Sequence, residues 1–550
     1  MSSKQEADDH TSPAVDTATA DAGDDLKEEK KKYLQEDDED NIDVRRNKNT
    51  WYAAPTLWQN KNSTSHHNDN DDEWEWEHLF LDLFYVPAIS NLSELLASVV
   101  GYPDVTQEQV DAWNYYEYYS IRGDALLCFI AVFFAIWYSW YHQCVYESKF
   151  IARDTFHRVL NRGRLIFVAV SIYQISEYDE LVGEDEQNEL SFYFCLGITL
   201  ECIISLLLRV EAIIMTRDDD GVVMKDSIVT VTSEFCPRLA FYIAAWIAHN
   251  RSEQWPWLVL CGALVPSIFL MLVQHFKHSS MIPMSRHVYI SRIGSWVSII
   301  IGEGIISLLN PGDIRRDDDL ISGVLGIVTL TIVHSIYFSN HGQISASEKF
   351  RGRLQTALIE LLSLAFIGIG VASKQGANTQ NTLLKMRDLA ELQFFNATMP
   401  ERPSDFMYYY ITEYQYVVID EPNDFKASAN VERSENTYPM VLRMYANLAF
   451  FFCLPALLFF LEAIFWTSNP AYVAKIRGLF RGQDGGKGKG KMTLVVSILV
   501  LQLAALLAVA VTGIVNDGMM SLEQVYRHII GFVLSAAFLL SRIIVVSALK

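Results

Sequence analysis

The feature that most constrains this chain is a series of long apolar stretches, because about 20 apolar residues in a helix are enough to cross a lipid bilayer. Lipid offers no hydrogen-bonding partner to an open backbone, and these stretches do not alternate as barrel strands do. The sequence therefore predicts an all-α, polytopic bundle of transmembrane helices. Twelve spans are expected, at 79–100, 123–146, 160–178, 190–215, 229–249, 255–275, 293–310, 319–339, 354–373, 440–466, 493–515 and 526–547.

The charges of the connecting segments predict the orientation, since Lys and Arg accumulate in cytoplasmic loops. The connection 147–164 holds Lys149 and four arginines, and 467–491 is also basic, whereas 177–189 contains no basic residue. This alternation places both termini in the cytoplasm. Two glycosylation motifs, at Asn250 and Asn396, then fall on the outer side, where glycosylation takes place. A plasma membrane or a secretory-pathway membrane is the expected location.

Short repeated motifs indicate that the chain consists of two related halves. "IWYSWYH" at 136–142 resembles "IYFSNH" at 336–341, "RGRL" occurs at 162–165 and 351–354, and "VEAII" at 210–214 resembles "LEAIF" at 461–465. A six-plus-six duplication of this kind would give parallel halves; chance similarity between apolar segments is the alternative. The expected units are 76–285 and 286–550, the second with an outer loop at 374–438 and a basic cytoplasmic loop at 467–491.

The charge and the cysteines of the chain argue against several classes of function. The formal net charge is −22, and residues 1–75 are rich in Asp, Glu, Lys, Ser and Thr, which predicts a disordered cytoplasmic tail. An acidic balance disfavours nucleic-acid binding. The seven cysteines are scattered without a C-x-x-C pair, so neither a disulfide framework, a zinc site nor another metal centre or cofactor is indicated.

Three stretches resemble a known family. "HLFLDLFYV" at 78–86 is similar to the "ELFFDLVFV" signature of the low temperature requirement A (LtrA) family of polytopic membrane proteins. "SRIGSWVSIIIGEG" at 291–304 resembles that family's "ERFGLFTIIVLGE", and the aromatic stretch 136–154 resembles its Trp-rich second helix. His78 and Ser291 stand where the family has Glu. The resemblance covers roughly 75–345 and implies a membrane protein with many spans, without an established reaction or substrate.

Ionisable residues inside the apolar stretches are the candidate functional groups, because charges in the bilayer are costly and are usually paired or functional. Asp82 and Glu94 lie about 120° apart on a helix, so they do not form one paired-carboxylate site. Arg164 or Arg292 could reach Asp82, which leaves a structural ion pair and a functional carboxylate both open. Glu201 and Arg209 could line one cavity. The candidates for binding a substrate or ion are Asp82, Glu94, Glu201, Arg209, Arg292, Glu303 and Glu360.

Two places combine a carboxylate with a helix-perturbing residue. Pro87 interrupts the first span, and Gly302 and Gly304 flank Glu303 near the middle of the seventh. Proline removes a backbone donor, and paired glycines allow either close helix approach or a local break. The sequence therefore suggests a midplane binding site; packing glycines are the alternative.

These observations favour a secondary transporter, or permease, for a small solute. Interior carboxylates would couple it to protons, through Glu303 with Glu201 or Glu360. The first alternative is a membrane-embedded enzyme acting on a lipid or isoprenoid, which the Asp-rich loops at 217–221 and 315–320 bring to mind. The second alternative is a channel or receptor. The lipid bilayer, a solute and the proton are the expected partners.

Overall fold

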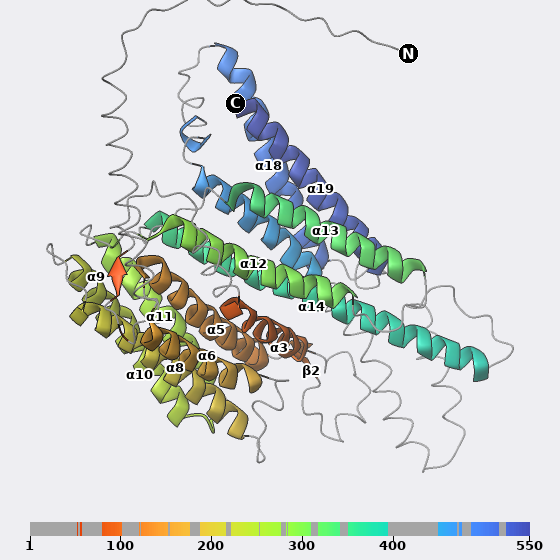
Figure 1. The fold of residues 1–550 in the computed structure, drawn as a ribbon. Coiled ribbons are helices and arrows are strands. Elements are labelled where there is room, and N and C mark those ends of the chain that lie inside the picture. The colour runs from red at the N-terminus through yellow and green to blue at the C-terminus, as the bar shows by residue number, and fades with distance from the viewer. Residues whose placement is uncertain are drawn as a thin grey trace, which may run out of the picture.

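The structure is a computed structural model. It describes residues 52, 55–57, 80–101, 120–121, 123–151, 154–175, 188–215, 222–251, 254–276, 282, 284–309, 317–341, 350–393, 449–469, 472–475, 486–515 and 524–549. Nearly all of the described chain is helical (Figure 1). The expected tail, apart from residues 52 and 55–57, and most of the expected outer loop, including Asn396, lie outside the described residues.

The first half of the chain contributes α3 (Val86–Ala97), α5 (Gly123–Lys149), α6 (Thr155–Tyr173), α8 (Asn188–Met215), α9 (Val222–Thr230), the π-helical segment η3 (Val231–Phe235), α10 (Cys236–Ile247) and α11 (Trp255–Phe276). The second half contributes α12 (Arg286–Leu309), α13 (Asp317–His341), α14 (Phe350–Gln393), a helix at Ala449–Ser468, α18 (Gly486–Val515) and α19 (Gln524–Leu549). α14 continues well into the segment that the sequence assigned to the outer loop.

Every one of the twelve predicted spans falls on a helix in the described residues. Eight helices are long and apolar enough to cross a membrane, and three more are apolar but shorter. The remaining one is α6, whose first half carries Arg158, Arg162 and Arg164. The prediction of a polytopic helical bundle is confirmed, and the chain is an integral multi-pass membrane protein.

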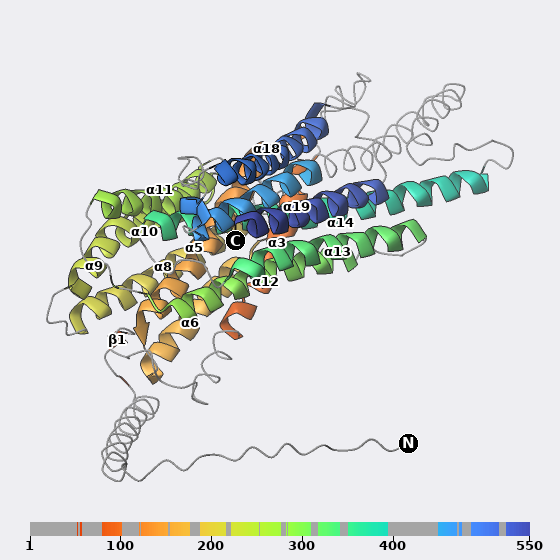
Figure 2. The same cartoon turned by 90° about the horizontal axis from the view of Figure 1, so that it is seen from above.

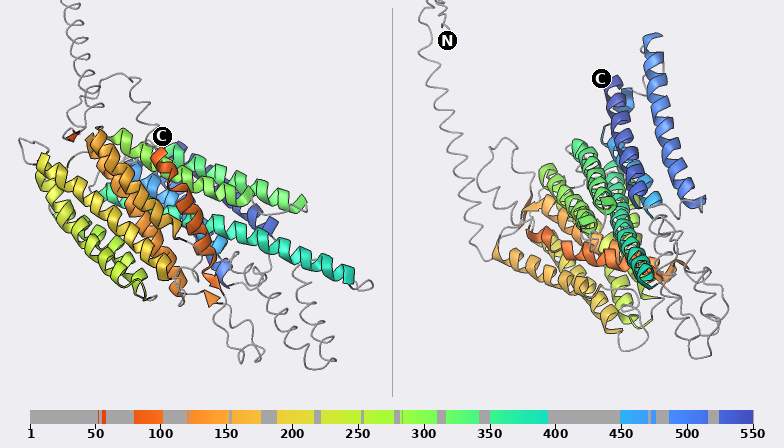
Figure 3. Two further views of the ribbon diagram at one scale, coloured as in Figure 1. Left: turned by 60° about the horizontal axis from the view of Figure 1, so that its bottom comes forward. Right: turned by 90° about the vertical axis from the view of Figure 1, so that its right-hand side faces the viewer.

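α5 is the helix around which the bundle is built. Every residue from Ala131 to Lys149 is buried, because α5 packs against α3, α8, α11 and α12. α6, α8, α10 and α11 stack beside one another on one side of it, while α13, α19 and α18 follow on the far side of α12 and α14 (Figures 1 and 2). The end of α14 projects beyond the other helices (Figure 3). The C-terminal half of α5 is therefore shielded from the surroundings of the bundle on all sides.

The first span is interrupted beside Pro87. Residues 80–83 form one helical turn, Phe84 and Tyr85 form a turn, and α3 starts at Val86 with Pro87 in its first turn. Proline is tolerated there because the first N–H groups of a helix have no partner within the helix. The interruption lies directly after Asp82.

α12, in contrast, runs unbroken through Gly302 and Gly304. A Cβ added at Gly370 of α14 would lie 3.4 Å from the Gly304 Cα, whereas a Cβ at Gly302 would meet nothing within 4 Å. Gly304 thus serves close packing between α12 and α14, one of the two roles that the sequence left open, and the helix break is not found.

A short strand pairing attaches the segment before the first span to the end of α5. β1 (Thr56–Leu57) pairs antiparallel with β4 (Phe150–Ile151), which directly follows α5. Tyr52 stacks on His157 with ring centroids 6.2 Å apart. Burial and the neighbouring Glu211 carboxylate raise the pKa of the Tyr52 phenol. A second pairing joins β2 (Val100–Gly101) and β3 (Ser120–Ile121).

Candidate functional site: a buried polar network and a recess beside α12

Arg292 of α12 lies between two carboxylates in the interior. Its Nη1 is 2.8 Å from Asp82 Oδ1, and its Nε is 3.4 Å from Glu147 Oε2 of α5. Trp140 Nε1 donates a hydrogen bond of 2.9 Å to the same Asp82 oxygen, and Gln143 Nε2 donates one of 2.7 Å to Glu147. Of the two arginines that the sequence offered to Asp82, Arg292 is the partner. The three ionised groups join the first helix, α5 and α12.

Aromatic rings enclose this Arg292 group. The rings of Trp140 and Trp296 lie 4.7 Å apart, and Trp137 lies 5.1 Å from Trp296. The Tyr85 ring is 6.0 Å from Trp296. Because Asp82, Glu147 and Arg292 are buried, each charge depends on its hydrogen bonds and its counter-charge, so loss of one partner is expected to cost about 3–5 kcal/mol.

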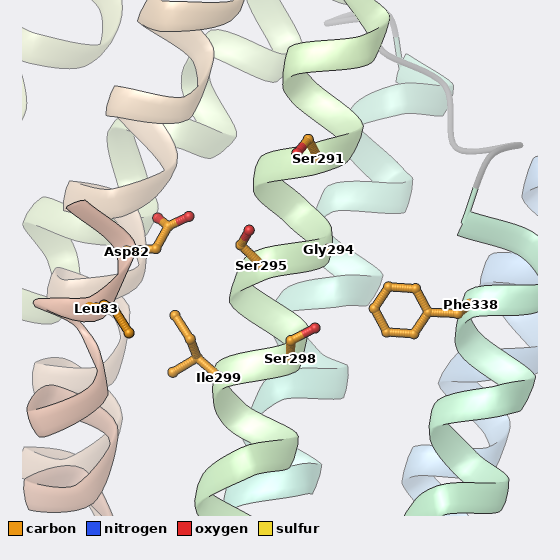
Figure 4. A pocket seen from close by; sticks show the side chains of 8 residues that line it. All are labelled: Asp82, Leu83, Ser291, Gly294, Ser295, Ser298, Ile299 and Phe338. Carbon is orange, nitrogen blue, oxygen red and sulfur yellow. The ribbon is translucent and has the colours of Figure 1, made fainter. Parts of the chain in front are cut away.

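A recess of about 500 Å³ opens next to the Asp82 carboxylate. Figure 4 shows Asp82 reaching from the first helix toward α12, a column of serines along α12, and the Phe338 ring approaching from α13. The serines are four and three residues apart, so they share one face of the helix. The lining residues are Asp82, Leu83, Ser291, Gly294, Ser295, Ser298, Ile299 and Phe338.

A second ionic group consists of Arg164 and Glu201, whose Nη1 and Oε1 atoms are 3.8 Å apart. Ser205 donates a hydrogen bond of 2.9 Å to Glu201. Tyr85 lies between this pair and Arg292, close enough to interact with the charges of both groups. Both groups therefore meet at the interrupted first span.

Arg209 does not join Glu201 in a common cavity. Its guanidinium lies over the rings of Tyr146 and Phe235, 5.2 Å and 5.8 Å from their centroids. It also donates to the His142 carbonyl at 3.4 Å. Arg209 therefore faces a neighbouring part of the network around α5.

A third group forms where two helices are irregular. Arg238 of α10 donates to the Gly262 carbonyl at 3.1 Å and to Ser267 Oγ at 2.7 Å. Residue 266 is a proline, so the Gly262 carbonyl lacks the N–H that a regular helix would supply. The Arg238 Nε–H donates to this carbonyl instead of the missing backbone N–H. Its Nη2 is 3.5 Å from Glu234 in η3, and His142 Nε2 is 3.6 Å from the same carboxylate.

Glu360 of α14 lies near this third group but forms no ion pair with any residue that the structure describes. It is 5% exposed, and its Oε1 has no hydrogen-bond partner among the described residues. It interacts with Tyr138 of α5 and, by charge, with Arg238. Tyr138 in turn lies under Arg238, with the guanidinium carbon 4.8 Å from the ring centroid.

Glu303 lies elsewhere, on the α12 face near α3 and α14. It is 8% exposed and interacts with Ser90, Ser307 and Lys374. It does not line the recess at Asp82. Glu94 of α3 is exposed, and it contributes a like charge near Glu303.

The structure thus brings Asp82 together with Arg292 and leaves Glu201, Glu303 and Glu360 in separate surroundings. Sequence reasoning missed Glu147, Glu234 and Arg238, which complete the network. A signal existed in α5, where Ser139, Gln143 and Glu147 recur every four residues inside an apolar span, with His142 next to Gln143. Such spacing places polar side chains on one side of a helix.

The remaining sequence candidates have different positions. Asn250 is exposed in the short connection between α10 and α11. The Asp-rich loop 217–221 and the side chains of 315–320 lie outside the described residues. Within the part of the chain that is described, no three His, Cys, Asp or Glu side chains are grouped as metal ligands would be.

Comparison with known proteins gives one family. The sequence pattern of the bacterial low temperature requirement A protein (LtrA) matches residues 74–390, which is more than half of the chain. No curated protein and no solved structure matches the chain. The matched range includes Asp82, Arg292 and Glu303, which the motif resemblance carried over, and the recess beside α12. The chain belongs to the LtrA family of multi-pass membrane proteins.

Proposed function

We propose that this protein is a secondary transporter that carries a small polar solute across the membrane, with both termini in the cytoplasm, and that intramembrane carboxylates couple it to protons. The observation that carries the proposal is the recess of about 500 Å³ beside α12, in which a buried carboxylate and a column of hydroxyls line a membrane-spanning helix. Small-molecule sites have volumes of about 300–1,000 Å³.

The lining suggests the chemistry of the solute. Asp82 is already balanced by Arg292 at 2.8 Å, so the recess offers hydrogen-bonding groups more than net charge. The serine hydroxyls donate and accept, and the Asp82 carboxylate accepts. Leu83, Ile299 and Phe338 supply apolar walls. A hydroxyl-rich, uncharged solute fits this combination, with its carbon skeleton against the apolar walls.

The position of Asp82 suggests how binding of a solute would change the packing of the helices. Arg292 ties the first helix to α5 and α12 through Asp82 and Glu147. A solute that hydrogen bonds to Asp82 competes for the oxygens on which this link depends. Binding would therefore act on the packing of α12 against α5, beside the interruption at Phe84 and Tyr85.

The test uses the purified protein in proteoliposomes that contain a pH-sensitive dye. A panel of sugars, polyols, amino acids and their amides is added outside, and solute-dependent proton movement is recorded. Ser298 is exposed at the recess, so Ser298→Trp fills the space without disturbing the core. We expect at least a tenfold loss of solute-dependent proton movement in this variant.

The control is Ser373→Ala in α14, which removes a buried hydroxyl that has no partner among the described residues. This variant should retain its solute response. If no member of the panel moves protons, or if Ser298→Trp responds like the unaltered protein, the transporter proposal is wrong.

A further inference from the structure

Glu360 differs from four other buried carboxylates of the described chain. Asp82 and Glu147 share Arg292, Glu201 has Arg164, and Asp226 has Lys149 at 2.8 Å. Among the described residues, Glu360 has no cation within ion-pair distance, and its buried Oε1 has no hydrogen-bond partner. A negative charge held there would cost several kcal/mol. The carboxyl is therefore expected to hold its proton in this conformation.

Arg238 is a guanidinium whose charge acts on Glu360, and it could pair with Glu360 if the proton left. It is now held by Glu234 at 3.5 Å, by Ser267 at 2.7 Å and by two carbonyls of α11. The Tyr138 ring lies beneath Arg238, and Tyr138 also interacts with Glu360. One cation thus stands between two carboxyls on different helices, η3 and α14.

The helices around Arg238 are irregular at two places. The π-helical turn at Val231–Phe235 carries Glu234 immediately before α10, and Pro266 interrupts the hydrogen bonding of α11. Helices bend at such places because the regular ladder is already broken. If Arg238 changes its ion-pair partner, α10 and α11 can therefore move relative to α14.

We propose that Glu360 is the proton-carrying group of this protein and that Arg238 moves from Glu234 toward Glu360 when the proton leaves. The proposal rests on the proposed transporter function and names its coupling site. In the protonated state Glu360 is neutral and Arg238 holds Glu234. When Glu360 releases its proton to water, its new negative charge attracts Arg238, and Glu234 keeps His142 as its neighbour.

Other charged or titratable groups around this site keep different partners. Tyr289 of α12 is hydrogen bonded to Thr356, one turn before Glu360. Glu303 has Lys374, and Arg542 of α19 interacts with Glu462. The groups closest to the switch are Tyr138, His142, Glu234, Arg238 and Arg353.

Infrared spectroscopy of the purified protein in lipid nanodiscs tests the proton directly, because a protonated carboxyl has its own carbonyl band. At neutral pH we expect a band that Glu360→Gln removes. Glu94→Gln is the control, since Glu94 is another membrane glutamate but its side chain is exposed. It should leave that band in place.

Two further variants give shifts of opposite sign. Arg238→Gln removes the cation that would stabilise the Glu360 carboxylate, so the pH at which the band disappears should rise by about one unit or more. Glu234→Gln frees Arg238 for Glu360, so that pH should fall. Opposite shifts would identify Arg238 and Glu234 as charges that set the protonation of Glu360.

The outcomes separate the two proposals. If Glu360→Gln leaves the carboxyl bands unchanged while solute still moves protons in the proteoliposomes, the coupling site is wrong and the transporter stands. If the band and both shifts are found but no solute moves protons, the transporter is wrong and Glu360 remains the proton-carrying group. Shifts of the same sign in Arg238→Gln and Glu234→Gln would also overturn the switch.

Discussion

Arg292 is a buried base that is the ion-pair partner of two buried carboxylates. It is 2% exposed and has carboxylates of the first helix and of α5 as partners. The indole N–H of Trp140 and the amide of Gln143 donate further hydrogen bonds to these two carboxylates. The arrangement holds only while all members are present.

Arg292→Gln should therefore lower the thermal stability of the detergent-solubilised protein, by an amount consistent with about 3–5 kcal/mol for a broken buried ion pair. Replacing Asp82 and Glu147 by Asn and Gln in the same chain should recover part of the loss, because no unpaired charge then remains. Fluorescence-detected size-exclusion chromatography after heating measures both. Arg251→Gln, at an exposed position, is the control. Equal melting of Arg292→Gln and the unaltered chain would contradict the argument.

Individual site residues could be predicted from the sequence only in part. Asp82, Arg292, Glu303 and Glu360 stand out because a charge inside an apolar run is conspicuous. Their partners do not, because pairing depends on which helix faces which. Glu147 lies at the border of a span and a basic loop, so it reads as a solvent-exposed residue until α5 is found buried to its last turn.

At the scale of the helices, small residues decide how closely elements approach. α12 and α14 touch where Gly304 faces Gly370, and a side chain at Gly370 would be driven toward the α12 backbone. Close backbone approach at small residues is a usual way for membrane helices to associate. The hydroxyl of Tyr289 and the indole of Trp296 on α12 hydrogen bond to Thr356 and Ser363 of α14 along the same contact.

Gly370→Leu should separate α12 from α14 and reduce the yield of monodisperse protein several-fold, whereas Gly302→Leu should be tolerated because nothing lies within 4 Å of a Cβ there. Size-exclusion profiles of the two variants, expressed side by side, provide the comparison. The packing argument fails if Gly302→Leu is as damaging as Gly370→Leu.

Helix positions were predictable because bilayer thickness imposes a minimum length on every apolar run. The irregularities within the helices were harder to predict from the sequence. Pro87 predicted the interruption of the first span. Pro266 could likewise have predicted that the Gly262 carbonyl lacks its helical hydrogen bond. The π-helical turn at Val231–Phe235 has no comparable marker, because its cost is offset by tertiary contacts of Glu234. The length of α14 also exceeds its apolar portion, since residues after 373 are polar but lack proline.

At the scale of the whole molecule, the placement of both termini in the cytoplasm and the six-plus-six repeat remain predictions. They make the connection between α10 and α11 external and the start of α12 internal. Arg251 and His287 are exposed at these two places. A cysteine at either position reports the side of the membrane on which it lies.

Arg251→Cys should react with a membrane-impermeant maleimide on intact cells, and His287→Cys should react only after permeabilisation. Labelling of the unaltered chain, which has seven cysteines of its own, sets the baseline. Reaction of His287→Cys on intact cells would reverse the orientation. Arg251→Cys keeps the Asn250 motif, so a glycosidase-sensitive shift in mobility can be sought in the same sample.

The pairing of Thr56–Leu57 with Phe150–Ile151 has a mechanical consequence. It fastens the segment before the first span to the strand that directly follows α5, whose residues from Ala131 to Lys149 are all buried. A displacement of residues 56–57 would therefore reach the buried end of α5 through backbone hydrogen bonds.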